Sequence, residues 1–179
     1  MSLLKKLFGI AGADPPVSNG AAADTETVRR IVSQLESLEP QRARHLAAFA
    51  YVMGRVAHAD LDISEAETWK MEQIVRELGH LPEEQAVLVV QIAKSQNRLF
   101  GGTEGYLVTR EFRRIATSEQ RAELLDCLFA VSAADESISA TEENQVRQIA
   151  SELGFTHEQY LAVRSAYSHK RAVLRRPPS

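Results

Sequence analysis

An internal repeat constrains the fold of this chain more than any other feature of its sequence. Displacing the sequence by 75 residues aligns residues 56–79 with residues 131–154 without a gap, and 11 of the 24 aligned pairs are identical. Chance does not account for so many identities in so short a gap-free stretch. The two segments therefore predict the same local structure twice, and any fold proposed for the chain has to contain both copies.

Each copy contains the signals of a helix start after a tight turn. Ser64 is followed three residues later by Glu67, and Ser139 by Glu142. This S-x-x-E spacing is typical of a capping box, in which the hydroxyl and the carboxylate each accept a hydrogen bond from a free backbone amide at the start of a helix. A helix is therefore predicted to begin at each serine.

The end of that helix is also marked in both copies. Gly79 and Gly154 each follow a leucine at the end of an apolar stripe, where a glycine can close the helix in the left-handed conformation. A further helix is expected to start with Pro82 in its first turn in copy one, and at the capping pair Thr156 and Gln159 in copy two. Each copy thus predicts helix, turn, helix, glycine stop and helix.

The remaining sequence extends this pattern to an all-α domain over residues 24–172, with copies at about 40–99 and 118–171. A helix from Asp24 or Thr25 through Glu36 and another from Pro40 are expected, and no strand pattern is present. Apolar spacings of three and four predict a single core-facing stripe in each copy. Leu46, Phe49, Ala50, Met53 and Val56 form the first, and Leu124, Leu125, Leu128, Val131 and Ser132 the second.

Composition limits the class of protein. The 179 residues include 44 % apolar residues, enough for one core, and the single Cys127 cannot form an intramolecular disulfide. With no signal-peptide pattern and no apolar run near the roughly 20 residues that span a bilayer, the sequence predicts a cytoplasmic protein. A net charge of -3 gives no general attraction to nucleic acid, and only the two ends of the chain are expected to be basic.

The repeated segments resemble the tellurite-resistance TerB-like family. They read Ala59-Asp60-x-x-Ile63-Ser64-x-x-Glu67 and Ala134-Asp135-x-x-Ile138-Ser139-x-x-Glu142, each followed by a helix ending in Leu-Gly. The amino-terminal domain of the DjlA co-chaperone is similar. The resemblance covers about residues 40–170. It implies a compact bundle of about seven to eight helices, a non-enzymatic role in a stress or tellurite-resistance response, and an acidic site for a divalent metal.

The repeated aspartates leave two interpretations open. Asp60 and Asp135 continue the apolar stripes near predicted helix C-termini, where the helix dipole disfavours an anion by about 0.3–1 kcal/mol. Each can accept backbone amide hydrogens and stabilise the turn. Alternatively, a hard cation such as calcium or magnesium would take oxygen ligands from both copies. The candidate ligands are Asp60, Asp62, Glu67, Asp135 and Glu142.

A conventional EF-hand does not account for these acids. If Ile63 and Glu67 occupy loop positions eight and twelve, the first ligand positions of the two copies fall on Val56 and Val131. The glycine expected at position six is also missing. A cation site would therefore have to be assembled between the two copies.

Other conspicuous residues indicate packing or binding rather than catalysis. Cys127 lies in an apolar run and is expected to be a buried thiol, and Gly101-Gly102 lacks the downstream residues of a phosphate-binding loop. Three histidines, His45, His58 and His80, are expected at the surface or its boundary. Trp69 lies off the apolar stripe of its helix, so it either packs beneath the amino-terminal segment or anchors a protein partner.

The chain ends suggest a second functional class. Residues 1–8 place Leu3, Leu4, Leu7 and Phe8 opposite Lys5 and Lys6, residues 9–23 are expected to be a flexible linker, and residues 173–179 form a basic tail. The first segment could rest on an anionic membrane surface, with Lys170, Arg171, Arg175 and Arg176 adding attraction. It could equally dock on its own bundle, because so short a helix is marginal by itself.

Overall fold

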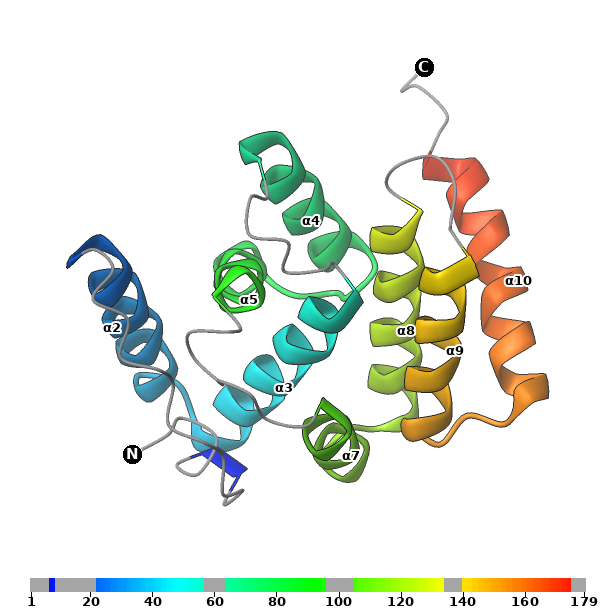
Figure 1. The fold of residues 1–179 in the computed structure, drawn as a ribbon, viewed down its shortest axis with the longest axis horizontal. Helices are drawn as coiled ribbons and strands as arrows, with labels where there is room; N and C mark the ends of the chain where they lie inside the picture. Colours follow the sequence, from blue (N-terminus) through cyan, green and yellow to red (C-terminus); the bar gives the residue numbers. More distant parts are fainter. Residues whose placement is uncertain (1–6, 9–21, 57–63, 96–104, 134–139, 175–179) are drawn as a thin grey trace.

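The computed structural model describes residues 7–8, 22–56, 64–95, 105–133 and 140–174. In the last four of these ranges, side chains are described from residue 26 to residue 167. These residues form eight helices and contain no strand (Figure 1). The prediction of an all-α fold of seven to eight helices is confirmed. The helices are α2 (Ala22–Glu36), α3 (Pro40–Val56), α4 (Glu65–Glu77), α5 (Glu83–Lys94), α7 (Gly105–Ile115), α8 (Ser118–Ser132), α9 (Ala140–Glu152) and α10 (His157–Leu174).

Helices α3 and α8 form the centre of the bundle. In α3 the predicted stripe is buried, but so are Ala47, Ala48 and Val52, each of which is fully inaccessible. The reason is that α5, α7, α8 and α9 all pack on α3, so no side of its second half faces solvent (Figure 1). The expectation of a single buried stripe was therefore too narrow for this helix. Helix α8 has the same character from Leu124 to Ala130.

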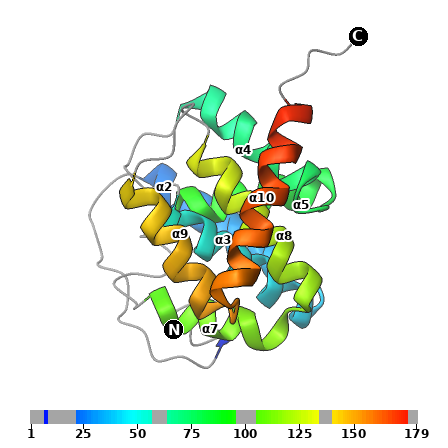
Figure 2. The same cartoon turned by 90° about the vertical axis from the view of Figure 1, so that its right-hand side faces the viewer.

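The repeat appears in the structure as two equivalent helix triplets. Helix α4 and helix α9 each contain 13 residues and start at equivalent positions of the two copies, and α5 corresponds to the first part of α10. The triplets do not pack as separate units, because α3 contacts α9 and α8 contacts α4. Figure 2 shows α8, α9 and α10 of copy two in front of α3 of copy one. The first helix of each copy thus packs on the second helix of the other.

The predicted helix starts at Ser64 and Thr156 are confirmed, whereas α2 starts at Ala22, before the predicted Asp24 or Thr25. Ser64 Oγ accepts a hydrogen bond from the Glu67 amide at 3.2 Å, and the Glu67 carboxylate accepts one from the Ser64 amide at 2.7 Å. The same reciprocal pair joins Thr156 and Gln159 at the start of α10. Pro82 immediately precedes α5, close to its predicted position. Ser139 lies outside the described residues.

The two glycine stops differ from each other. Gly154 is left-handed as predicted, with φ 92°. For Gly79 the prediction was wrong, because the left-handed residue after α4 is the next one, His80, with φ 53°. Gly79 is needed for a different reason: a Cβ there would lie 2.5 Å from the Val75 carbonyl oxygen and 3.3 Å from the Phe49 ring. Position 79 therefore requires glycine because there is no space for a side chain, and not because its φ is positive.

The start of the chain contacts the bundle where it is described. Leu7 and Phe8 are half-buried and pack against the main core, and Leu7 lines a small cavity together with Val32 and Leu35. This agrees with docking of the segment on its own bundle. Leu3, Leu4 and the two lysines of the segment lie outside the described residues. Among the helices described, none has the length and apolar character that crossing a membrane requires.

Candidate functional site

The acids singled out in the sequence fall partly within the described structure. Glu67 and Glu142 lie in the first turns of α4 and α9, whereas Asp60, Asp62 and Asp135 lie outside the described residues. Within the described residues, no group of three or more histidine, cysteine, aspartate or glutamate side chains is close enough to hold a metal ion. Any cation site on the repeated acids therefore depends on the three aspartates.

Glu67 already has a structural role. Its Oε2 atom accepts the hydrogen bond from the Ser64 amide, and this bond lowers the pKa of the exposed carboxyl below its usual value. Within the described part of the chain, the other oxygen, Oε1, has no hydrogen bond. Glu67 can therefore offer a cation one carboxylate oxygen while it continues to cap α4 with the other.

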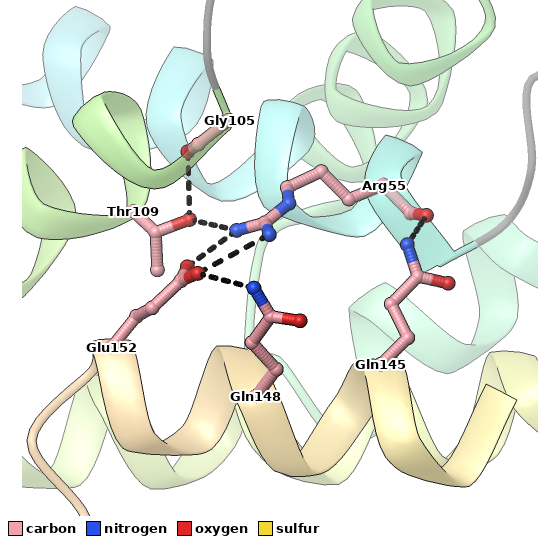
Figure 3. Close-up of polar contacts among 6 residues, drawn as sticks. All are labelled: Arg55, Gly105, Thr109, Gln145, Gln148 and Glu152. Atoms are coloured by element: carbon pink, nitrogen blue, oxygen red, sulfur yellow. Dashed lines mark hydrogen bonds and ion pairs between the residues drawn. The ribbon is translucent and has the colours of Figure 1, made fainter. Parts of the chain in front are cut away.

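The end of α3 meets the first half of α9 (Figure 3). The Gln145 side chain donates a hydrogen bond to the backbone carbonyl of Arg55, the penultimate residue of α3. Helix α9 starts at Ala140, five residues before Gln145, which corresponds to about 7.5 Å along the helix axis. The end of α3, before residues 57–63, and the start of α9, after residues 134–139, therefore lie near each other.

A polar network fixes this junction. Arg55 Nη1 donates to Glu152 Oε2 at 2.6 Å and to Thr109 Oγ1 at 2.7 Å, and Gln148 donates to Glu152 Oε1 at 3.3 Å (Figure 3). The Arg55 and Glu152 side chains are only 14 % and 18 % exposed. Their hydrogen bonds are charge-assisted and partly shielded from water, so the network ties α3, α7 and α9 together more firmly than a surface pair would.

Trp69 does not pack beneath other parts of the chain. Its side chain is 64 % exposed, which contradicts the expectation that the amino-terminal segment covers it. It lies in the second turn of α4, five residues after the cap Ser64. The exposed indole agrees with the other expectation, that Trp69 contacts a partner, because tryptophan is enriched at the centres of protein interfaces.

The histidines were only partly predicted. His45 is buried rather than at the boundary, with 8 % exposure, and burial first and nearby Arg42 second lower its pKa to about 4. His80 is exposed, and its Nδ1 atom lies 3.0 Å from Glu123 Oε1. His58 lies outside the described residues, as does Gly101-Gly102. Cys127 is fully buried as predicted, so its thiol is a core group.

A basic pocket that was not predicted lies between α7 and the start of α8. A cavity of about 390 Å³ is lined by Arg110, Glu111, Arg113, Arg114 and Arg121. The expectation that only the two chain ends are basic was therefore wrong. The signal was present in the sequence, because Arg110, Arg113 and Arg114 have the spacing of one helix face. The net charge of -3 for the whole chain does not show this local cluster of arginines.

Comparison with known proteins identifies the family. The model of the family described as "Tellurite resistance protein TerB" matches residues 45–165, which is more than half of the chain and includes both aligned segments, residues 56–79 and 131–154. No curated protein and no solved structure shows significant similarity to the chain. Because this match covers more than half of the chain and the described structure is all-α, the chain belongs to the tellurite-resistance TerB family.

Proposed function

We propose that this protein is a non-enzymatic binding module whose repeated acidic turns hold a divalent cation, calcium or magnesium. The observation that carries the proposal is the hydrogen bond from Gln145 to the Arg55 carbonyl. It holds the end of α3, which the first acidic segment follows, against the first half of α9, which the second acidic segment precedes. Acids from both copies would then serve one ion. The ligands we propose are Asp60, Asp62 and Asp135, completed by Glu67 and Glu142.

The chemistry of these residues suits a hard cation. Calcium and magnesium prefer oxygen ligands, and five carboxylates supply them without histidine or cysteine. The capping hydrogen bond keeps Glu67 ionised and leaves one oxygen available, as a ligand requires. A role in tellurite resistance or another stress response is part of the proposal and rests on the family alone.

Metal titration of the metal-free protein tests this proposal. Thermal unfolding and the fluorescence of Trp69, the only tryptophan, would be followed with calcium, magnesium, manganese and zinc. A ligand that binds only the folded state adds about 2.7 kcal/mol of stability at a hundredfold excess over its Kd. We expect a shift with calcium or magnesium in the wild type and none in the Asp60→Asn, Asp135→Asn double variant.

A matched control separates a specific site from a general charge effect. The Glu119→Gln, Glu158→Gln double variant removes the same two charges from the exposed first turns of α8 and α10. It should respond to metal as the wild type does. If no metal shifts the wild type, or if both double variants lose the response equally, the cation proposal is wrong and the aspartates act as turn residues.

A second candidate function is that of an adaptor for a protein partner, as in a co-chaperone. The exposure of Trp69 favours it. A photo-crosslinking amino acid at position 69 should capture a discrete partner in cells, whereas one at Leu161, another exposed apolar position, should not. A membrane-surface adaptor receives less support, because Leu7 and Phe8, two of the four apolar residues it would use, already pack against the core.

A further inference from the structure

We propose that the basic pocket between α7 and the start of α8 binds a phosphate group. Four arginines and one glutamate line the cavity, so its walls carry a formal charge of about +3 in a protein whose net charge is -3. This concentration of guanidinium groups is independent of the acidic turns, because it lies near the opposite ends of α8 and α9 (Figure 1).

Two of the arginines have no partner within the described structure. Neither Arg110 nor Arg113 makes an ion pair or a hydrogen bond with a described residue, and both are exposed. Only Arg114 is neutralised locally, by Glu111, with Nε 3.1 Å from Oε1. Guanidinium groups that face one cavity without counter-ions repel one another, and an anion between them would relieve that repulsion.

The other side of the pocket is held rigidly. Arg121 donates from Nη1 to the Leu153 carbonyl and from Nη2 to Ser118 Oγ, each at 3.0 Å, which fixes its guanidinium at the wall. Its third nitrogen, Nε, is buried and has no hydrogen-bond partner among the described residues. A buried donor without a partner is unfavourable, and a negative charge in the adjoining cavity would offset this cost.

The backbone makes room for Arg113. Gly154 has φ 92°, and a Cβ at that position would lie 2.7 Å from Arg113 Nε and 2.9 Å from its Cζ. The guanidinium therefore lies directly over the glycine, between the ends of α7 and α9. Arg113 and Arg114 lie in the last turn of α7, where the helix dipole favours a positive charge. The dipole does not account for the charge at Arg110 or for the orientation of Arg121.

The chemistry of the walls indicates the class of ligand. Planar guanidinium groups bind tetrahedral oxyanions through paired hydrogen bonds, and a phosphate dianion nearly matches the excess positive charge. The cavity is larger than a single phosphate ion, so it can admit the phosphate of a small ester or of a phosphorylated side chain. The shared element is the phosphate group, and its source is a matter for experiment.

Calorimetric titration of the full chain at constant ionic strength tests this inference. The probes are inorganic phosphate and O-phosphoserine, with chloride as the background anion. We expect saturable binding to the wild type and a loss of affinity of at least about tenfold in the Arg110→Gln, Arg113→Gln variant, because two charge-assisted contacts are removed. Tighter binding of phosphoserine would indicate an ester, and tighter binding of phosphate the free ion.

Two further variants keep the test decisive. The Arg29→Gln, Arg76→Gln variant removes equal charge from exposed positions on α2 and α4 and should bind both probes as the wild type does. The Arg110→Lys, Arg113→Lys variant keeps the charge but not the paired geometry and should bind with intermediate affinity. If the wild type shows no saturable binding of either probe, or if the control variant loses as much affinity as the pocket variant, the proposal is overturned.

Discussion

At the scale of single residues, His45 links the stability of the bundle to pH. Its ring lies among aromatic side chains, with ring centroids 5.2 Å from Phe112 and 6.2 Å from Phe49. Burial, with Arg42 as a second cause, lowers its pKa to about 4 from the ordinary value of 6.5. The folded protein therefore holds a neutral imidazole under conditions in which the unfolded chain is already protonated.

The free energy of unfolding should fall as pH decreases through this window. Above pH 6.5 His45 is neutral in both the folded and the unfolded state, so it does not change the free energy of unfolding. Between pH 6.5 and about 4 only the unfolded chain takes up the proton, which favours unfolding. The full loss corresponds to about 3 kcal/mol. Urea unfolding at several pH values, compared with His45→Phe, isolates this contribution from that of the carboxylates. Identical pH dependence in the two proteins would contradict the assignment.

The two glycine stops show how much of the role of a single residue can be predicted from the sequence. Both were found from their place after Leu78 and Leu153, and both positions do require glycine. Which constraint acts at each depends on neighbours that are distant in sequence. Gly79 lies against the ring of Phe49, whereas Gly154 has the left-handed backbone. A one-dimensional pattern identifies such positions without distinguishing these two causes.

At the scale of elements, Arg55 is the side chain that joins three helices. Its guanidinium binds Glu152 of α9 and Thr109 of α7, and a Cβ on Gly105 would lie 2.8 Å from its Nε atom. The equivalent position in copy two is Ala130, although the partner position keeps its acid as Glu77. Helices α4 and α9 therefore start and end at equivalent positions, but within the described residues this junction has no counterpart at Ala130.

Replacing Arg55 with methionine should destabilise the protein by about 2 kcal/mol, because Glu152 is left partly buried without its cation. Chemical denaturation measures the change, and a double-mutant cycle with Glu152→Gln isolates the coupling between the two residues. The control is Arg30→Met, which breaks a pair with Glu26 that is about 70 % exposed and should cost less than about 0.5 kcal/mol. Equal effects of the two methionine variants would show that the junction contributes no more than a surface pair.

Helix boundaries were the most predictable elements, because they depend on residues close in sequence. The boxes at Ser64 and Thr156 formed as expected, and a third at Thr117 with Gln120 has the same spacing. The basic pocket and the Arg55 junction were not predicted. Both combine residues from helices that are far apart in the chain, and the sequence does not show which helices meet.

At the scale of the whole molecule, the duplication produces one core rather than two. A tandem repeat allows each triplet to fold on itself, but here α3 packs on α9 and α8 packs on α4. The core includes Val75 of copy one and Ile149 of copy two in a single cluster with the two central helices. The repeat predicted which helices form, but the crossed pairing depends on tertiary contacts between the copies.

Neither half of the chain should therefore fold by itself. A fragment ending at residue 104 would expose the face of α3 that α7, α8 and α9 cover, and the second half of α3 is buried in the whole protein. Each half should show helical far-ultraviolet circular dichroism without a cooperative unfolding transition, because its apolar surface lacks a partner. Mixing residues 1–104 with residues 105–179 should restore one cooperative transition. If either half alone unfolds as sharply as the intact chain, the crossed pairing is not what holds the domain together.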